Sequence, residues 1–302
     1  MTHQKTQTTL AIFLFVAVLA GNAVIFAIVP HLTQDLGYSA FQIMLCYSAI
    51  ATFCMLPWAF RQGIAGLKTT RLPAYSLRAL LEYGSFTLSF YSLSYLGDYF
   101  TLPMHTALNF MTPLLATVVA ILVLREKSHF HTWLALLIGF AGVLAITRPG
   151  MIPLSPGVLY VLGAAAGFSG TGVVIKLLCR SESSRHIAFY MLAMTTVLAL
   201  PAGIAHWKAP SPEGWVWLVM IGVIAYLQQV SIASAIARVP YTMLIPLNFT
   251  TLIFSTILSY FFYHKLIDGW TLAGALIILA GTIYNTQRSR AIAAREAIIA
   301  TV

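Results

Sequence analysis

The chain has 302 residues, of which 59% are hydrophobic and only 8% are charged, and its mean hydropathy is +0.85. A soluble domain carries about 25% charged residues. This composition therefore excludes a soluble globular protein and indicates that lipid surrounds most of the chain. The formal net charge is +9, but the basic residues lie at the ends of apolar runs, which is typical of membrane topology rather than of nucleic-acid binding. The three cysteines show no metal-ligand spacing, so we expect neither a metal nor a cofactor.

A helix needs about 20 apolar residues to cross a bilayer, and the chain supplies ten apolar runs that we predict to be spans. They lie near Thr9–Pro30, Ala40–Phe60, Ala74–Leu96, Leu102–Leu124, Trp133–Thr147, Gly157–Leu178, Ile187–His206, Gly214–Ala237, Tyr241–Tyr263 and Trp270–Thr286. The first run is too long for a signal peptide, so we expect it to remain as a membrane span. The third and fourth runs almost touch at Gly97–Tyr99, which leaves nine spans as the alternative.

The positions of Lys and Arg predict the orientation, because cytoplasmic loops are enriched in them. With a cytoplasmic N-terminus, the inner ends hold Lys5, Arg61, Lys68, Arg71, Arg78, Arg125, Lys127, Lys176, Arg180, Arg185, Arg238, Arg288, Arg290 and Arg295. The outer ends hold only Arg148, Lys208 and Lys265. We therefore predict a multi-pass protein of the cell membrane, in a bacterium the inner membrane, with both termini in the cytoplasm.

The two halves of the chain repeat each other. Leu108–Phe110 recurs as Leu247–Phe249, and at the same offset of 139 residues Ala141-Gly142 meets Ala280-Gly281. This predicts two repeats, residues 1–150 with spans one to five and residues 151–302 with spans six to ten and a short basic tail. Because equivalent spans are five apart, they cross the membrane in opposite directions, and such inverted repeats are typical of secondary transporters.

Several segments resemble the EamA-type transporters of the drug/metabolite transporter superfamily. The similar segments are Leu108–Pro113, Leu122–Glu126, Trp133–Val143 and Arg148–Gly150 in the first half, and Ala233–Pro246, Trp270–Gly274 and Ala280-Gly281 in the second. The resemblance implies an all-α integral membrane fold in which ten transmembrane helices form two inverted five-helix repeats around a central cavity. It also implies transport of amino acids, nucleotide-related metabolites, vitamins or drugs. One position departs from the repeat: Lys265 stands where the first half has Glu126.

Charged residues inside the third predicted span are the first candidates for a binding site. Arg78 and Glu82 are four residues apart on one helical face, and Phe86 and Phe90 continue that stripe. A charge in a membrane helix costs about 2.5–3.5 kcal/mol on insertion scales and by default indicates function. We predict that Arg78 binds an anionic group and Glu82 a cation or a coupling proton. The alternative is an ion pair in which Arg78 extends to the cytoplasmic interface.

Amides and aromatic rings supply the other candidates. Asn109 and Asn248 occupy equivalent places in the two halves, where an amide could bind a zwitterionic or heterocyclic substrate or only join helices. Gln228 and Gln229 lie together in the eighth span, and at least one should face inward. Tyr91 could stack on an aromatic or cationic substrate, although an aromatic stripe is more often packing.

These features predict a secondary transporter that moves an amino-acid-like or nucleoside-related metabolite across the membrane by alternating access. Drug or metabolite efflux by the same fold is the alternative. A membrane enzyme would need a cluster of His, Asp or Glu at cavity depth, and a receptor would need a ligand or signalling domain; the sequence indicates neither. We expect a small-molecule substrate, coupling to protons or to a counter-substrate, and a monomer or homodimer in the lipid bilayer.

Overall fold

The computed structural model describes residues 2–66, 68–124, 130–151, 153–178, 181–236, 247–248 and 250–300. Its regular elements are α1 (Thr2–Pro30), the π-helix η1 (His31–Asp35), α2 (Ala40–Gly66), α3 (Leu72–Leu93), α4 (Leu102–Asn109), α5 (Thr112–Leu124), α6 (Phe130–Thr147), α7 (Pro156–Leu178), α8 (Ser184–Ala205), α9 (Pro212–Ile236), α11 (Thr250–Tyr263) and α12 (Gly269–Ala300). The predicted all-helical fold is thus confirmed for the described residues.

Five described segments are long and apolar enough to cross a membrane on their own. They are Thr9–Asp35, Ala40–Gly63, Pro156–Ile175, Ser184–Ala205 and Pro212–Ile232. Three shorter apolar helices accompany them, Trp133–Thr147, Thr250–Tyr263 and Gly269–Asn285. α3 is not among these segments, and it contains Arg78, Glu82 and several serines. The count of ten spans and their division into two repeats remain predictions.

The predicted fourth span is not one helix. α4 ends at Asn109 and α5 begins at Thr112, and between them Phe110 and Met111 donate backbone hydrogen bonds of 3.1 Å to Ala107 and Leu108, three residues back. Pro113 lies in the first turn of α5, where its missing N–H and fixed φ suit a helix start. The run from Leu102 to Leu124, which we predicted as the fourth span, therefore consists of two helices joined at this turn.

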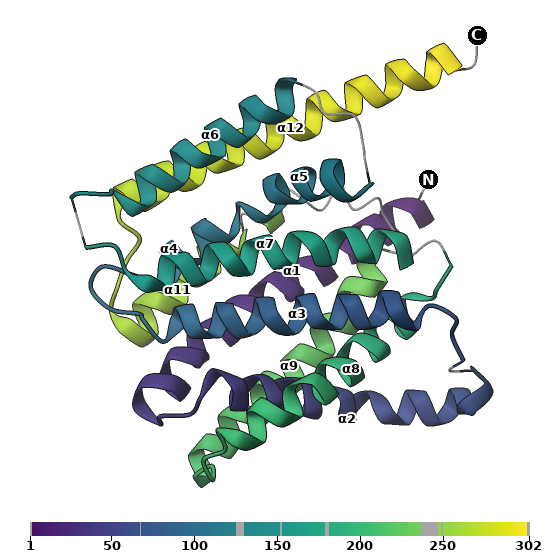
Figure 1. The fold of residues 1–302 in the computed structure, drawn as a ribbon, viewed down its shortest axis with the longest axis vertical. Coiled ribbons are helices and arrows are strands. Elements are labelled where there is room, and N and C mark those ends of the chain that lie inside the picture. The colour runs from purple at the N-terminus through teal and green to yellow at the C-terminus, as the bar shows by residue number, and fades with distance from the viewer. Residues whose placement is uncertain are drawn as a thin grey trace.

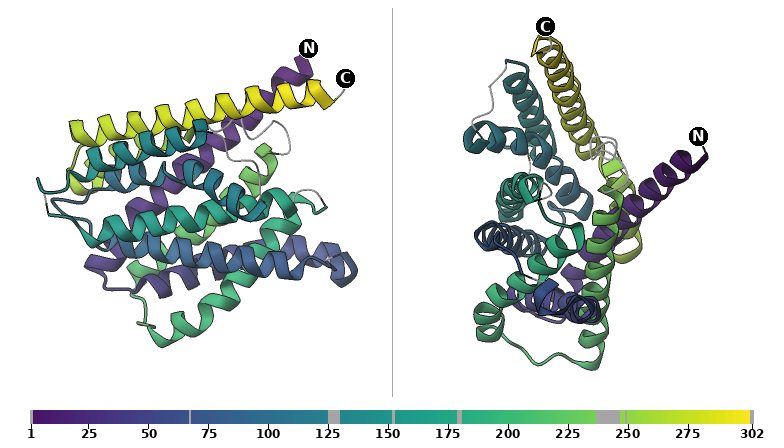
Figure 2. Two further views of the ribbon diagram at one scale, coloured as in Figure 1. Left: turned by 45° about the horizontal axis from the view of Figure 1, so that its top comes forward. Right: turned by 90° about the vertical axis from the view of Figure 1, so that its right-hand side faces the viewer.

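The helices pack as neighbouring pairs that lie far apart in the sequence. α6 lies along α12 at one edge of the molecule, α2 and α8 lie at the opposite edge, and α3 and α7 run side by side between them (Figures 1 and 2). At the α3–α7 contact, a Cβ on Gly167 would meet the Ser85 Oγ at 2.1 Å. The small residue at position 167 thus allows α7 to approach the polar face of α3 closely.

The crossing of α6 and α12 relates the two halves of the chain. A Cβ on Gly142 would meet the Gly274 carbonyl oxygen at 2.7 Å and the Ile278 side chain at 2.6 Å, while one on Gly281 would meet the Ala135 carbonyl oxygen at 3.0 Å. Adding the offset of 139 turns Gly142 into Gly281 and Ala135 into Gly274. Residues related by this offset therefore make matching contacts across an antiparallel pair of helices.

This crossing predicts a position-specific effect on stability. Gly142→Ala should lower the free energy of unfolding by about 1–3 kcal/mol, because the added methyl overlaps backbone that cannot move aside without separating the helices. Gly172→Ala is the matched control, since a Cβ there meets nothing within 4 Å, and it should be neutral or stabilising by up to about 1 kcal/mol. Thermal unfolding of the detergent-solubilised protein measures both. Equal melting temperatures for the two variants would contradict the close crossing.

Candidate substrate-binding site

The buried charges of α3 lie at the centre of the candidate site. Arg78 and Glu82 are only 4% and 7% exposed, and both lie on α3. Arg78 Nη1 donates a 2.8 Å hydrogen bond to the backbone carbonyl of Ile187 in α8, and its charge acts on the Glu82 carboxylate. Arg78 therefore does not extend to the surface, and it ties α3 to α8.

Glu82 keeps one hydrogen-bonding position open. Its carboxylate lies close to the Thr171 hydroxyl of α7 and to Tyr47 of α2, so helices from both halves of the chain meet around it. The Oε2 atom is buried and has no hydrogen-bond partner among the described residues. A buried acceptor without a partner costs about 1–3 kcal/mol, and more when the group is charged. Such an atom is a candidate for contact with a ligand.

Aromatic rings adjoin this carboxylate. The Tyr47 ring centroid lies 5.2 Å from that of Phe86 and 6.1 Å from that of Phe90, and Phe168 of α7 lies edge-on to Phe86 at 5.0 Å. The Gln229 side chain of α9 is close to the Tyr47 hydroxyl. The structure thus brings the predicted residues Glu82, Phe86, Phe90 and Gln229 together around Tyr47, which the sequence analysis did not select. We call Tyr47, Glu82, Phe86, Phe90 and Gln229 the central cluster.

Other predicted residues lie elsewhere. Gln228 is buried and donates a 2.9 Å hydrogen bond to the Val18 carbonyl, so it joins α9 to α1. The half-buried Tyr91 packs between Phe41 and Tyr160, with ring centroids 5.6 Å and 6.0 Å away. Asn248 is half-buried in the short described segment 247–248. Gln228 and Tyr91 thus make structural contacts outside the central cluster.

Asn109 lies beside a histidine that the sequence analysis did not select. Its amide nitrogen is 3.2 Å from the His105 carbonyl oxygen and 3.4 Å from His105 Nε2. His105 Nε2 is also 3.0 Å from the Ser89 Oγ of α3, and Phe26 of α1 lies edge-on to the ring at 4.9 Å. No simple pattern distinguishes this histidine in the sequence, because its partners Ser89 and Phe26 are distant along the chain. The predicted Asn109 thus belongs to a second polar group.

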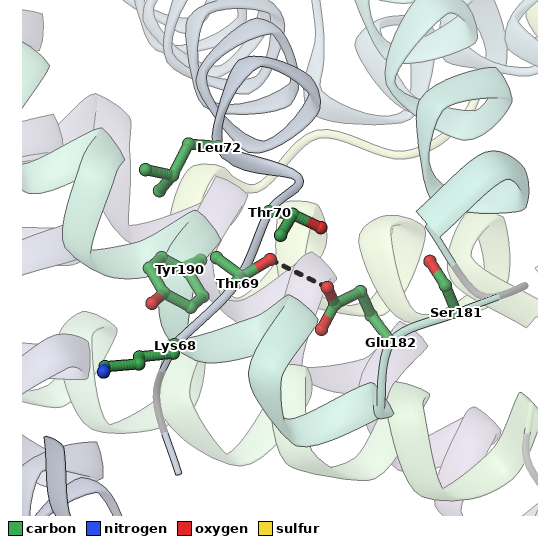
Figure 3. A pocket seen from close by; sticks show the side chains of 7 residues that line it. All are labelled: Lys68, Thr69, Thr70, Leu72, Ser181, Glu182 and Tyr190. Carbon is green, nitrogen blue, oxygen red and sulfur yellow. Dashed lines mark hydrogen bonds between the residues drawn. The ribbon is translucent and has the colours of Figure 1, made fainter. Parts of the chain in front are cut away.

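The largest cavity we describe opens at one end of the bundle. It has a volume of about 780 Å³ and lies between the α2–α3 and α7–α8 connections, at the end where both termini lie (Figure 1). Figure 3 shows the Thr69 hydroxyl donating to the Glu182 carboxylate, at 2.8 Å, while the Lys68 side chain points away from Glu182. A smaller cavity of about 210 Å³ lies at the opposite end, between α4 and α11.

That opposite end carries several ionic contacts between segments remote in sequence. Asp98, after α3, pairs with Lys265, before α12. Arg148, after α6, pairs with Asp268 at 2.9 Å. His31 lies 3.2 Å from Glu213 at the start of α9. The hydrogen bond from the Lys265 ammonium, together with its charge, lowers the pKa of the Asp98 carboxyl below its usual value, so this pair persists down to acidic pH.

Long apolar helices, a closely packed interior and buried charges surrounded by helices from both halves define an integral membrane protein with a polar site in its interior. The EamA-like transporter family matches residues 9–148 and again residues 155–287. The chain belongs to this family of the drug/metabolite transporter superfamily, and it is a transporter of small metabolites.

Similar proteins from several bacteria carry different substrates. The chain is 28% identical to an S-adenosylmethionine uptake transporter of Rickettsia felis, over 81% of this chain and 82% of that protein. It is 27% identical to a riboflavin transporter of Vibrio cholerae, over 92% and 93% of the two chains. It is 25% identical to the pseudopaline exporter CntI of Pseudomonas aeruginosa, over 81% and 85%. A solved crystal structure shares the fold, with a TM-score of 0.63 at 17% identity over 95% of this chain and 99% of that one.

The two adjacent glutamines should respond differently to the same substitution. Gln228→Leu removes the buried side-chain hydrogen bond to the Val18 carbonyl and should lower the free energy of unfolding by about 1 kcal/mol. Gln229→Leu should cost clearly less, because Gln229, although part of the central cluster, is only half-buried. Thermal unfolding of both variants under one set of conditions provides the comparison. A larger loss for Gln229→Leu would reverse our assignment of the two side chains.

Proposed function

We propose that the chain takes up a metabolite of the S-adenosylmethionine type, in which a nucleoside is joined to a positively charged amino-acid portion. The observation that carries this proposal is the Glu82 Oε2 atom, buried and without a hydrogen-bond partner among the described residues, beside the rings of Tyr47 and Phe86. A carboxylate next to aromatic faces suits a sulfonium or ammonium centre, since ring faces attract cations. Such a substrate combines the amino-acid-like and nucleoside-related classes that the sequence predicts.

The open acceptor on Glu82, rather than the net charge of the site, supports a cationic ligand, because Arg78 already balances the Glu82 charge. A buried carboxylate needs a counter-charge, and Arg78 contributes one from one turn away on the same helix. Arg78 also donates to the Ile187 backbone, so it is positioned by α8 as well. An ammonium group at Oε2 would donate to the open acceptor, and a sulfonium centre would be attracted there by its charge, whereas an anion would be repelled by Glu82.

The two ends of the bundle suggest how the site is reached. In the proposed ten-span topology, the 780 Å³ cavity beside Lys68 faces the cytoplasm and the ionic contacts of Asp98, Arg148 and Lys265 close the outer side. The equivalent α6–α12 contacts support two inverted repeats, divided between residues 150 and 151, which can exchange inward- and outward-open states. The location of both termini at one end agrees with an even number of spans, and we place that end in the cytoplasm of the bacterial inner membrane.

Uptake into proteoliposomes tests the substrate. We expect the wild-type protein to accumulate labelled S-adenosylmethionine, and unlabelled riboflavin to compete poorly, because riboflavin offers no cation to Glu82. Glu82→Gln should weaken apparent affinity roughly 10- to 100-fold, the range of a lost charged hydrogen bond. Asp35→Asn is the matched control, because Asp35 is an exposed carboxylate outside both the central cluster and the ionic contacts assigned to the outer side.

Three results would contradict parts of this proposal. Accumulation of riboflavin instead of S-adenosylmethionine would overturn the substrate class. Substrate loss only from preloaded vesicles would assign the direction to export. Proton coupling through Glu82 would be overturned if the uptake rate is the same with and without a pH gradient, both in the wild type and in Glu82→Gln. Exchange against a counter-substrate would then remain.

Cysteine labelling tests the closed outer side. In a protein whose three native cysteines are replaced by serine, Leu102→Cys places a thiol on the buried lining of the smaller cavity. Lys265→Met should speed its reaction with an impermeant maleimide added outside by about two- to fivefold, the scale of an exposed ion pair. Lys68→Met, at the other end, should leave the rate unchanged. Labelling only from the cytoplasmic side would contradict the proposed orientation.

A further inference from the structure

The two ring nitrogens of His105 differ in their contacts: Nε2 has polar neighbours, whereas Nδ1 has no hydrogen-bond partner among the described residues. Nε2 lies 3.0 Å from the Ser89 Oγ and 3.4 Å from the Asn109 amide nitrogen. An amide nitrogen can only donate, so Nε2 accepts and we assign the proton to Nδ1. Nδ1 is buried and has no hydrogen-bond partner among the described residues. His105 is therefore a neutral ring with an unused donor inside the bundle.

A second unused polar atom lies on α11, which packs against α4. Ser259 of α11 is only 1% exposed, and its hydroxyl has no partner among the described residues. Ser259 lines the 210 Å³ cavity together with Thr101 and Leu102, and His105 lies one helical turn further along α4, with its N–H on the Thr101 carbonyl at 2.9 Å. Ser259 therefore lines this cavity, and His105 lies one helical turn from Thr101 of the same lining, on a helix that packs against α11.

The size of this cavity indicates what it can hold. Sites for whole drug-sized ligands have volumes of about 300–1,000 Å³, so 210 Å³ suits one ring system of a larger molecule. Aromatic edges close the site beside the imidazole: Phe26 lies 4.9 Å and Phe100 6.4 Å from the His105 ring centroid. An N–H donor, a hydroxyl and aromatic neighbours together suit a flat, neutral heterocycle with hydrogen-bond acceptors at its edge.

The position of His105 relative to Glu82 follows from the geometry of α3. Ser89, which contacts His105, lies seven residues after Glu82, and a rise of 1.5 Å per residue places them roughly 10 Å apart on one helical face. Phe86 lies between them on that face. An elongated metabolite could reach both groups along this stripe.

We propose that His105 and Ser259 form a subsite that binds the neutral heterocyclic base of the substrate, while Glu82 binds its cationic centre. This inference rests on the proposed function and deepens it, because it assigns each half of the molecule to its own protein groups. It also makes His105 a specificity-determining residue. Neither half of the substrate alone can occupy both points.

Competition by the separate halves of the substrate tests the subsite. Adenosine carries the base without the cation, and S-methylmethionine carries the sulfonium without the base. Against uptake of labelled S-adenosylmethionine, His105→Leu and Ser259→Ala should each raise the inhibitory concentration of adenosine at least tenfold and leave that of S-methylmethionine unchanged. Glu82→Gln should do the reverse. His206→Leu, at the exposed end of α8, is the matched control and should change neither value.

The outcomes separate this inference from the proposed function. Ser259→Ala removes a single atom, so it keeps the test valid if His105→Leu unfolds, and melting temperatures identify that case. The subsite alone would be overturned if the wild type takes up S-adenosylmethionine but adenosine inhibits the Ser259→Ala protein and a folded His105→Leu protein as strongly as the wild type. An equal loss of inhibition by both fragments would make His105 a structural residue and likewise overturn it. Failure of the wild type to take up S-adenosylmethionine would overturn the proposed function as well.

Discussion

The burial of a charged pair on α3 is the constraint on which the remaining architecture depends. Exposure of Arg78 or Glu82 to lipid chains would cost several kcal/mol, so other helices must cover the charged face of α3. α2, α7 and α8 do this: α8 supplies a backbone acceptor for Arg78, α7 supplies Thr171 near Glu82, and α2 supplies Tyr47. The charged face of α3 is thereby covered by α2, α7 and α8.

The sequence predicts a site residue when the free-energy cost of placing its side chain in a membrane depends only on its own chemistry. A carboxylate in an apolar run is expensive wherever the run lies, so Glu82 could be selected without a structure. The sequence did not indicate which neighbouring side chain faces the site, because this depends on the rotation of a helix about its axis. Gln228 and Gln229 point about 100° apart on α9, and only the structure shows that the first contacts α1 while the second approaches Tyr47.

Tyr47 and His105 could not be predicted, since their significance comes from partners remote in sequence. Tyr47 stands in an apolar run without charged neighbours, and it becomes notable only because Glu82 and Phe86 approach it. The predicted internal repeat, by contrast, can be read from the sequence itself. A constant offset in the sequence predicts which residues should be equivalent, and Gly142 and Gly281 make matching contacts at the α6–α12 crossing.

The turn between α4 and α5 changes the mechanical cost of moving this part of the bundle. An intact membrane helix resists bending, because each backbone hydrogen bond broken in lipid costs several kcal/mol. Between Asn109 and Thr112 the regular helical bonding is already interrupted in the structure. A change in the backbone torsions of Phe110 and Met111 would therefore turn α4, which carries His105, relative to α5. The hydrogen bonds within both helices would stay intact.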